Sequence, residues 1–490
     1  MSTQERALVG GYNTFGNQGE ANADVKKKYP IINPYTTDLN ELNMLRLKAS
    51  APRKKFIEAI KKGQIEAPND LARYVFLGEK GPNLTKMAFP PSPPADSIDY
   101  KEVKELLTPV YNRFIKNIQD ETTDMPYEPY LKNAHDTYCD QAVFEAEVRA
   151  LQVNYLIACC TGDVADNRFF QTTMNHKKVL LLKDSKGYHA YNNTVGTAGP
   201  DVSNWYAAGD VQDLNLEGLK ELPCGVKCGI ILVLTHPENL APEDAMEESL
   251  NNKLENVFNK KLQRELSAYG IGKNRATVMQ QIAVDANWKM AVDTFGESYH
   301  FEKLHATTLK DSFVCNRLVY RSFDDDRDGS PCNSSMVLGR FTMQLLADGD
   351  LPEGPENLLS HMIPTFVLAY NTVFFPQPNG VFMSQIWPMD GPGKCMTTLA
   401  NMSTRLPADQ ERVVSEFGGI LDIFATEDFK ILPQMQANFQ ANKHAETIFG
   451  RHEPCLTYRH KLFAKLAELG RIEMRKTAKT PKKVAIASRL

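Results

Sequence analysis

The chain of 490 residues lacks the features that would place it in a membrane or on a polyanion. No apolar run is long enough to span a bilayer, and residues 1–20 have neither the basic nor the apolar region of a signal peptide. The net charge is only −4, with 24% charged residues, so nothing favours nucleic acid or an anionic lipid surface. We therefore expect a cytoplasmic protein whose partners are small molecules.

A cysteine framework is also missing. The nine cysteines are an odd number without regular spacing, so reduced thiols are expected. Cys159, Cys160, Cys224 and Cys228 could in principle supply four thiolates to a zinc or iron–sulfur site. Adjacent cysteines rarely chelate one ion, however, and C-x₃-C is an unusual spacing. Buried free thiols are therefore the preferred interpretation.

One acidic stretch only partly matches a calcium-binding loop. In "DDDRDGSPCNSS", Asp324, Asp326, Asp328 and Gly329 fit the first half of an EF-hand loop. The twelfth position is Ser335, which lacks the bidentate carboxylate that calcium requires. A solvated acidic turn is the better prediction.

The C-terminal residues 475–490 form a basic tail that ends in Ser488-Arg489-Leu490. That ending differs from the peroxisomal address S-K-L by one Lys-to-Arg change. Two interpretations stay open, a solvated tail with a chance ending, or a peroxisomal location if the host is eukaryotic.

The length favours two domains plus extensions. Residues 1–125 are irregular and polar and read as an N-terminal extension. Residues 126–245 form a small β domain, because "KKVLLLKDSKGYHAYNN" predicts two strands around a Gly turn and "CGIILVL" a buried strand. Residues 246–474 form the larger domain, which begins with a helix in "EDAMEESLNNKLENVFNKKLQRELSAYG" and contains a hairpin around Pro-Asn-Gly.

Two histidines lie close together, among acidic residues, in "VDTFGESYHFEKLH", residues 292–305. His300 and His305 would point about 140° apart on a regular helix, so they share an ion only if the helix ends or bulges between them. The spacing excludes the H-E-x-x-H zinc-protease motif. Two imidazoles plus a carboxylate from elsewhere in the chain would form the facial site of non-haem Fe(II), whereas the alternative is two unrelated surface or core histidines.

Three stretches carry a family resemblance across roughly residues 125–470. "NWKMAVDTFGESYHFEKLH" (287–305), "ATEDFKILPQMQANFQ" with the following "FGRHEPCLTYRHKLFAKL", and the entry segment "MPYEPYLKNAHDTYCDQAVFEAEV" resemble the catalytic (alpha) subunit of Rieske-type non-haem iron ring-hydroxylating oxygenases. The resemblance implies an α+β fold. Its parts are a Rieske-like β domain and a helix-grip (START/Bet v 1-like) catalytic domain with an antiparallel sheet.

The same resemblance implies a set of site residues. His300, His305 and Asp428 correspond to the ligands of a mononuclear Fe(II). Glu297, three residues before the first histidine, corresponds to the acidic residue that links the iron to the cluster of a neighbouring subunit. Asn287 and Tyr299 fall on positions that line or support the site, with helix packing as the alternative for each. A homo-oligomer, a trimer by analogy, is also implied.

The cluster of that family is what this sequence lacks. A Rieske [2Fe-2S] cluster needs C-x-H and C-x-x-H, and no cysteine of this chain is followed by histidine at either spacing. Where the first pair is expected, "YNNTVGTAGPDV" has Val195 and Thr197. We therefore expect the β domain to be retained without its [2Fe-2S] cluster.

Three functions stay open. The first is an Fe(II)-dependent oxygenase that uses O2 on a small apolar or aromatic substrate, with electrons from the substrate or an external reductant. The second is a monooxygenase subunit that borrows a Rieske cluster from a partner protein. The third is a non-catalytic ligand-binding or complex-stabilising paralogue. The pocket is expected to draw on the apolar residues Phe301, Leu304, Phe313, Phe374, Phe382 and Met383.

Overall fold

The computed structural model describes residues 98–126, 130–164, 168–194, 207–323, 333–349, 358–377, 380–404, 420–421 and 423–479. Several predicted features lie outside these residues: most of the N-terminal extension, the expected position of the first cluster ligands, the acidic turn at 324–332 and the C-terminal Ser-Arg-Leu. None of the described helices is long and apolar enough to cross a membrane.

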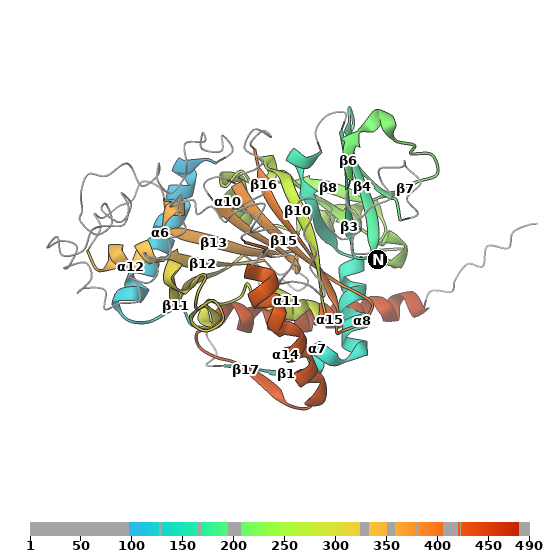
Figure 1. The fold of residues 1–490 in the computed structure, drawn as a ribbon. Helices are drawn as coiled ribbons and strands as arrows, with labels where there is room; N and C mark the ends of the chain where they lie inside the picture. The colour runs from blue at the N-terminus through green and yellow to red at the C-terminus, as the bar shows by residue number, and fades with distance from the viewer. Residues whose placement is uncertain are drawn as a thin grey trace, which may run out of the picture.

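A seven-stranded antiparallel sheet forms the centre of the molecule (Figure 1). Its strands follow the order β10-β16-β15-β14-β13-β12-β11, so most neighbours in the sheet are also neighbours in the sequence. Their bounds are β10 Arg275–Val284, β11 Phe313–Ser322, β12 Ser334–Arg340, β13 Met362–Leu368, β14 Thr372–Gln377, β15 Gly380–Pro388 and β16 Cys395–Ser403. The antiparallel sheet and the mixed helices confirm the α+β class.

β14 and β15 pair as the two strands predicted on either side of Pro-Asn-Gly, and residues 378–379 lie outside the described residues. Their register pairs Phe374 with Met383 and Phe375 with Phe382. Because side chains alternate between faces along a strand, these two pairs point to opposite sides of the sheet. Gly380 opens β15 at φ 153°, where an added Cβ would lie 2.4 Å from the carbonyl oxygen of Met402.

Helices and a small sheet lie along one side of the central sheet (Figure 1). α11 (Trp288–Asp293) packs against β15 and β16, and α14 (Phe429–Ala441) packs against β10 and α11. The C-terminal α15 (Pro454–Lys479) runs beside α8 (Gln141–Gln152). β1 (Leu131–Ala134) pairs antiparallel with β17 (Glu446–Phe449), and α7 (Asp136–Cys139) follows β1.

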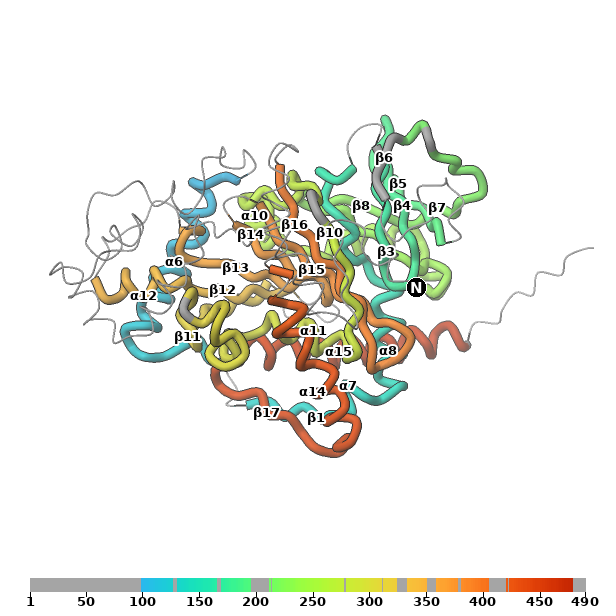
Figure 2. Tube along the Cα trace, viewed as in Figure 1, coloured from blue at the N-terminus to red at the C-terminus, as the bar shows by residue number. Residues whose placement is uncertain are grey.

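Some of the contacts cross the predicted domain boundaries, which stay predictions. α6 (Tyr100–Gln119) falls in the predicted N-terminal extension, yet it packs on α12 (Phe341–Ala347) and β11 of the central sheet (Figure 2). Its buried face includes Leu107 and Phe114. Residues 131–152, assigned to the β domain, pack instead against β17 and α15. α15 continues to Lys479, which lies within the predicted basic tail of residues 475–490.

The β domain consists of two antiparallel sheets beside the central one (Figure 1). A five-stranded sheet has the order β6-β3-β4-β5-β7, and a three-stranded sheet has the order β2-β9-β8. The predicted strands correspond to β4, β5 and the fully buried β9. The bounds are β2 Tyr155–Cys160, β3 Arg168–Met174, β4 Lys177–Asp184, β5 Gly187–Asn192, β6 Ala207–Asp210, β7 Lys220–Leu222, β8 Cys224–Lys227 and β9 Ile230–Leu234.

The single helix predicted between the two domains is in fact two helices, α9 (Glu247–Glu255) and α10 (Lys260–Ala268). Asn256 ends the first, and the Asn259 side chain accepts a hydrogen bond from Leu262 N at 2.9 Å to cap the second. Asparagine favours helix ends over helix interiors, which accounts for the break.

Candidate metal centre

The two histidines lie where a helix ends. His300 belongs to a 3₁₀ turn, η7 (Tyr299–Glu302), and His305 lies in the turn that follows. The carbonyl oxygen of His305 accepts hydrogen bonds from the backbone N–H groups of Thr308, Leu309 and Lys310 at 3.0–3.2 Å. Because the backbone is not a regular helix between them, the two rings approach each other, with centroids 5.0 Å apart. The 3₁₀ turn ends at Glu302, between the two histidines.

Asp428 reaches the same place from the other end of the domain. It is the last residue of a π-helical turn, η11 (Phe424–Asp428), directly before α14. Such turns are rare, and they occur often at functional sites because they re-aim side chains. The Asp428 side chain is 4% exposed, so the turn places a carboxylate in a nearly dry environment.

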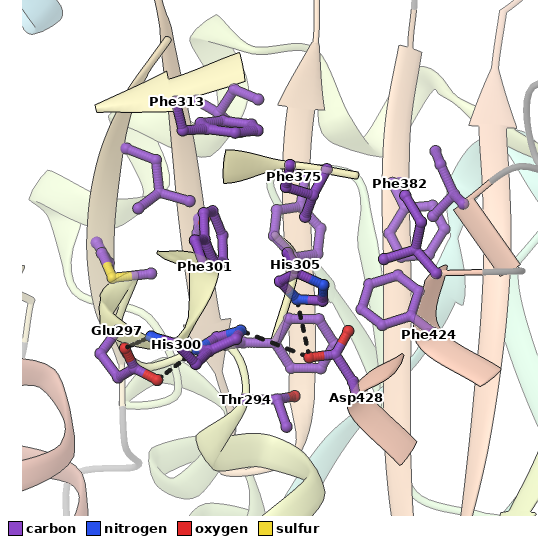
Figure 3. Close-up of a pocket in the computed structure, with 18 of the residues that line it drawn as sticks. Thr294, Glu297, His300, Phe301, His305, Phe313, Phe375, Phe382, Phe424 and Asp428 are labelled. Atoms are coloured by element: carbon purple, nitrogen blue, oxygen red, sulfur yellow. Dashed lines mark hydrogen bonds and ion pairs between the residues drawn. The ribbon is translucent and has the colours of Figure 1, made fainter. Parts of the chain in front are cut away.

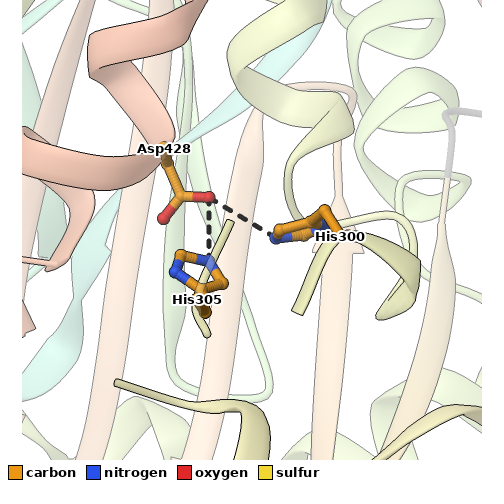
Figure 4. Close-up of side chains that lie close together, drawn as sticks. All are labelled: His300, His305 and Asp428. Atoms are coloured by element: carbon orange, nitrogen blue, oxygen red, sulfur yellow. Dashed lines mark ion pairs between the residues drawn. The ribbon is translucent and has the colours of Figure 1, made fainter. Parts of the chain in front are cut away.

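The three side chains converge on one point (Figure 4). Oδ1 of Asp428 lies 3.5 Å from Nε2 of His300 and 3.3 Å from Nε2 of His305. One nitrogen or oxygen atom of each residue lies within 4.8 Å of those of the other two. Among the described residues, this is the one group of His, Cys, Asp and Glu side chains close enough to hold an ion.

Each histidine has a second carboxylate on its other ring nitrogen (Figure 3 shows that of His300). Nδ1 of His300 lies 2.5 Å from Oε1 of Glu297, and Nδ1 of His305 lies 2.5 Å from Oε2 of Glu427. The Thr308 hydroxyl donates to the same Glu427 oxygen at 2.7 Å. A carboxylate on Nδ1 fixes the ring and directs Nε2 toward a metal.

Glu427 was not predicted from the sequence, although it directly precedes Asp428. The signal available was the pair of adjacent carboxylates in "ATEDF". Neighbouring residues in a helix point in different directions, so the pattern alone does not show that both side chains serve one centre. The contact between Glu427 and His305 spans 122 residues and depends on the tertiary fold.

The electrostatics of the centre favour positive charge between the carboxylates. Burial alone would lower the pKa of His300, but its hydrogen bonds with Asp428 and Glu297 raise that pKa to about 10. The same balance, with Asp428 and Glu427, raises the pKa of His305. Burial would raise the pKa of Asp428, yet the two imidazoles hold it below its ordinary value. An ion bound here replaces these protons, so its affinity rises with pH.

The two supporting residues lie outside the pocket lining. Asn287 caps α11 by accepting a hydrogen bond from Lys289 N at 3.0 Å, and it donates to Tyr138 O at 3.0 Å. It therefore supports the helix that leads into the histidine turn. Tyr299 is 61% exposed, so it points away from the ligands.

A mostly apolar pocket opens beside the three donors (Figure 3), with a volume of about 150 Å³. Of the apolar residues predicted to form it, Phe301, Phe313 and Phe382 line it. Leu304, Phe374 and Met383 are not among its lining residues. Phe374 and Met383 are paired on the opposite face of the sheet, and Phe375 takes the expected place of Phe374.

The fold and the donor set together define a class of protein, an antiparallel-sheet domain with two histidines and one carboxylate, the combination used for non-haem iron. The sequence adds a resemblance to a family. Residues 268–468 match the family described as "Ring hydroxylating alpha subunit (catalytic domain)". The matched segment contains all three donors and resembles the catalytic domain of the ring-hydroxylating oxygenase alpha subunits, in agreement with the predicted resemblance.

Two solved structures resemble this chain in part. One is the quaternary ammonium Rieske monooxygenase CntA with an inhibitor, at 12% identity and TM-score 0.49, covering 69% of this chain and 95% of CntA. Another is naphthalene 1,2-dioxygenase from Rhodococcus sp. bound to indole, at 11% identity and TM-score 0.46, covering 77% of this chain and 99% of the dioxygenase. A comparison with curated proteins finds no match.

Proposed function

We propose that this protein is an Fe(II)-dependent oxygenase that uses O2 on a small apolar or aromatic substrate and receives its electrons from outside its own chain. The observation that carries the proposal is the convergence of His300, His305 and Asp428 in the lining of a mostly apolar pocket. Two imidazoles and one carboxylate that leave coordination positions open are the donor set of non-haem Fe(II) oxygenases.

The donor geometry fits one ion. Two ligand atoms at right angles on bonds of about 2.1 Å lie about 3 Å apart. The separations of 3.3 and 3.5 Å from Asp428 Oδ1 to the two Nε2 atoms are close to this value. Bound Fe(II) would supply the binding and activation of O2. A small movement of the three side chains toward one another would bring all three donor atoms within bonding distance of one ion.

The chain's own residues prepare that site. Glu297 and Glu427 accept hydrogen bonds from the Nδ1–H groups of the two histidines, which leaves each Nε2 free for the ion. The Asp428 carboxylate neutralises one of the two positive charges of the Fe(II) ion. The phenylalanines of the pocket exclude water, which protects a reactive centre from side reactions. The wall formed by these phenylalanines holds the substrate next to the ion.

The proposed electron source follows from the sequence of the β domain. Four ligands, as C-x-H and C-x-x-H, would be needed for a Rieske cluster, and the chain contains neither pattern. Burial raises the pKa of the Cys159 and Cys160 thiols well above the ordinary value, which disfavours the thiolate that a cluster needs. The substrate itself or an external reductant then supplies the electrons.

A borrowed cluster is the second candidate, and the surface near Glu297 supports it. Glu297 is 12% exposed and bonds directly to His300, while the neighbouring Tyr299 projects into solvent. A partner that carries a Rieske cluster could therefore approach within one residue of a ligand. The predicted trimer and the cytoplasmic or peroxisomal location remain predictions.

Oxygen consumption separates these candidates. The full-length protein is loaded with Fe(II) under anaerobic conditions and then exposed to O2 with aromatic compounds, alone or with a Rieske ferredoxin and its reductase. Consumption by the protein alone supports electrons from the substrate, and consumption only with the ferredoxin supports the borrowed cluster.

His300→Ala and the matched control His444→Ala complete the experiment, because the His444 side chain is 97% exposed and lies outside the centre. Loss of activity only in His300→Ala supports the proposed site. If neither arm consumes O2, or if both variants behave like the unchanged protein, the oxygenase proposal is wrong and the non-catalytic alternative takes its place.

A further inference from the structure

The pocket beside the metal centre also restricts what it can hold. We propose that the substrate is an apolar molecule of about one six-membered ring that carries one hydrogen-bonding group, and that the Thr365 hydroxyl receives this group. The inference rests on the proposed function only in calling the bound molecule a substrate; the binding itself needs no iron.

The size of the pocket limits the substrate to about one ring. Its volume of about 150 Å³ equals that of an engineered apolar protein cavity that binds benzene. Six phenylalanines line it, Phe295, Phe301, Phe313, Phe375, Phe382 and Phe424. Phe382 stacks on Phe424 at 5.6 Å, and Phe375 lies 5.6 Å from Phe382. These packed rings close one wall of the pocket.

Thr365 sets the second part. It lies on β13, it is 1% exposed, and it lines the pocket. Within the described residues, its Oγ1 has no hydrogen-bond partner and is almost inaccessible in this conformation, so the hydroxyl meets a ligand after a rotation about χ1. Directly opposite on β12 is Met336, which offers only a weakly accepting sulfur. A buried hydroxyl without a partner destabilises a protein, so a ligand group that bonds to it gains affinity.

The other polar groups around the pocket are engaged elsewhere. Thr294 Oγ1 donates to Ala291 O at 2.9 Å, and Glu297 is bonded to His300. Gln377, on the neighbouring strand β14, is the further polar side chain on the sheet side of the lining. Thr365 therefore lies between Met336 and Phe375 in a wall that is otherwise apolar, and Gln377 lies two residues further along β14. A hydroxyl both donates and accepts, so alcohols, phenols and carbonyl compounds all suit Thr365.

A matched pair of ligands tests whether the Thr365 hydroxyl receives the hydrogen-bonding group. Phenol and toluene have nearly the same shape and differ by a hydroxyl in place of a methyl group. Their dissociation constants are measured by calorimetry on the full-length protein without added metal. We expect Thr365→Val to weaken phenol binding by about fivefold to tenfold and to leave toluene unchanged or tighter.

Thr397→Val is the matched control. Thr397 is a fully buried threonine on β16 of the same sheet, its Oγ1 also has no partner among the described residues, and it does not line the pocket. The control substitution should leave both ligands unaffected. Equal weakening of phenol and toluene by Thr365→Val, or weakening of phenol by Thr397→Val to the same extent, would overturn the role of Thr365.

Naphthalene tests the size limit on the same protein. We expect it to bind at least tenfold more weakly than toluene, although its larger apolar surface would favour tighter binding in an unrestricted site. Naphthalene binding as tight as toluene binding, or no binding of any of the three, contradicts the inference. Because no iron is present, a failure of the oxygenase proposal leaves these results unchanged, and the two proposals fail separately.

Discussion

Glu427 offers the sharpest test of how the centre is built. Its carboxylate accepts from Nδ1 of His305 at 2.5 Å and from the Thr308 hydroxyl at 2.7 Å, and the Glu427 side chain is 18% exposed. Carboxylates in this position orient the ring and raise its basicity, and their loss typically weakens metal binding by about 10–100-fold. The corresponding free energy is about 1.4–2.7 kcal/mol.

Two substitutions divide that range. Glu427→Gln keeps an oxygen that can accept from Nδ1 but removes the charge, so we expect about a tenfold loss of Fe(II) affinity. Glu427→Ala removes both contacts and leaves His305 free to rotate, so the loss should approach about 100-fold. The measurement is anaerobic competition against a chelator of known affinity.

The matched control is Glu145→Gln, at an exposed glutamate on α8 that bonds only to Gln141 among the described residues. It should bind Fe(II) as tightly as the unchanged protein. If Glu427→Ala also binds like the unchanged protein while His305→Ala loses the ion, then Glu427 does not position His305 and the reasoning is wrong.

Three further predictions concern stability, each checked by denaturant unfolding. Glu147→Gln leaves the buried ammonium of Lys289 without its ion-pair partner and should lower the free energy of unfolding by about 3–5 kcal/mol. The double variant Glu147→Gln with Lys289→Met should recover much of that stability. An equal loss of stability in the single and double variants would contradict the prediction. Burial, together with the charge of Arg340, lowers the pKa of His361 to about 4, so only the unfolded chain gains a proton as pH falls from about 6.5 to 4, and stability should drop by about 3 kcal/mol over that window; His361→Gln should reduce this slope, and an unchanged slope would refute the assignment. Gly380→Ala places its Cβ against a backbone carbonyl and should cost about 1–3 kcal/mol, and a neutral result would contradict the crowding.

Local patterns predicted the parts of the fold that local contacts determine. The hairpin of β14 and β15 and the strands β4, β5 and β9 lie where alternation and turn residues placed them. The packing of α6 on α12 could not be predicted, because these two helices are more than 200 residues apart and nothing in α6 specifies its partner. The break between α9 and α10 could have been predicted from Asn256 and Asn259.

The centre shows a similar division. His300, His305 and Asp428 were predicted through a family resemblance, and the structure brings them together across more than 120 residues of sequence. Phe374 was predicted to line the pocket, whereas the structure has Phe375 there. Because side chains alternate between the two faces of a strand, an error of one residue in the register exchanges the faces. Glu427 was missed because its role appears only once His305 is folded against it.

The ratio of iron to protein tests the central claim most directly. After anaerobic reconstitution with Fe(II) and sulfide and removal of unbound metal, the account predicts about one iron per chain, no acid-labile sulfide, and loss of the iron in Asp428→Asn. About three irons per chain with acid-labile sulfide would show a cluster together with the mononuclear site. Such a result, or iron retained in Asp428→Asn, would contradict the account.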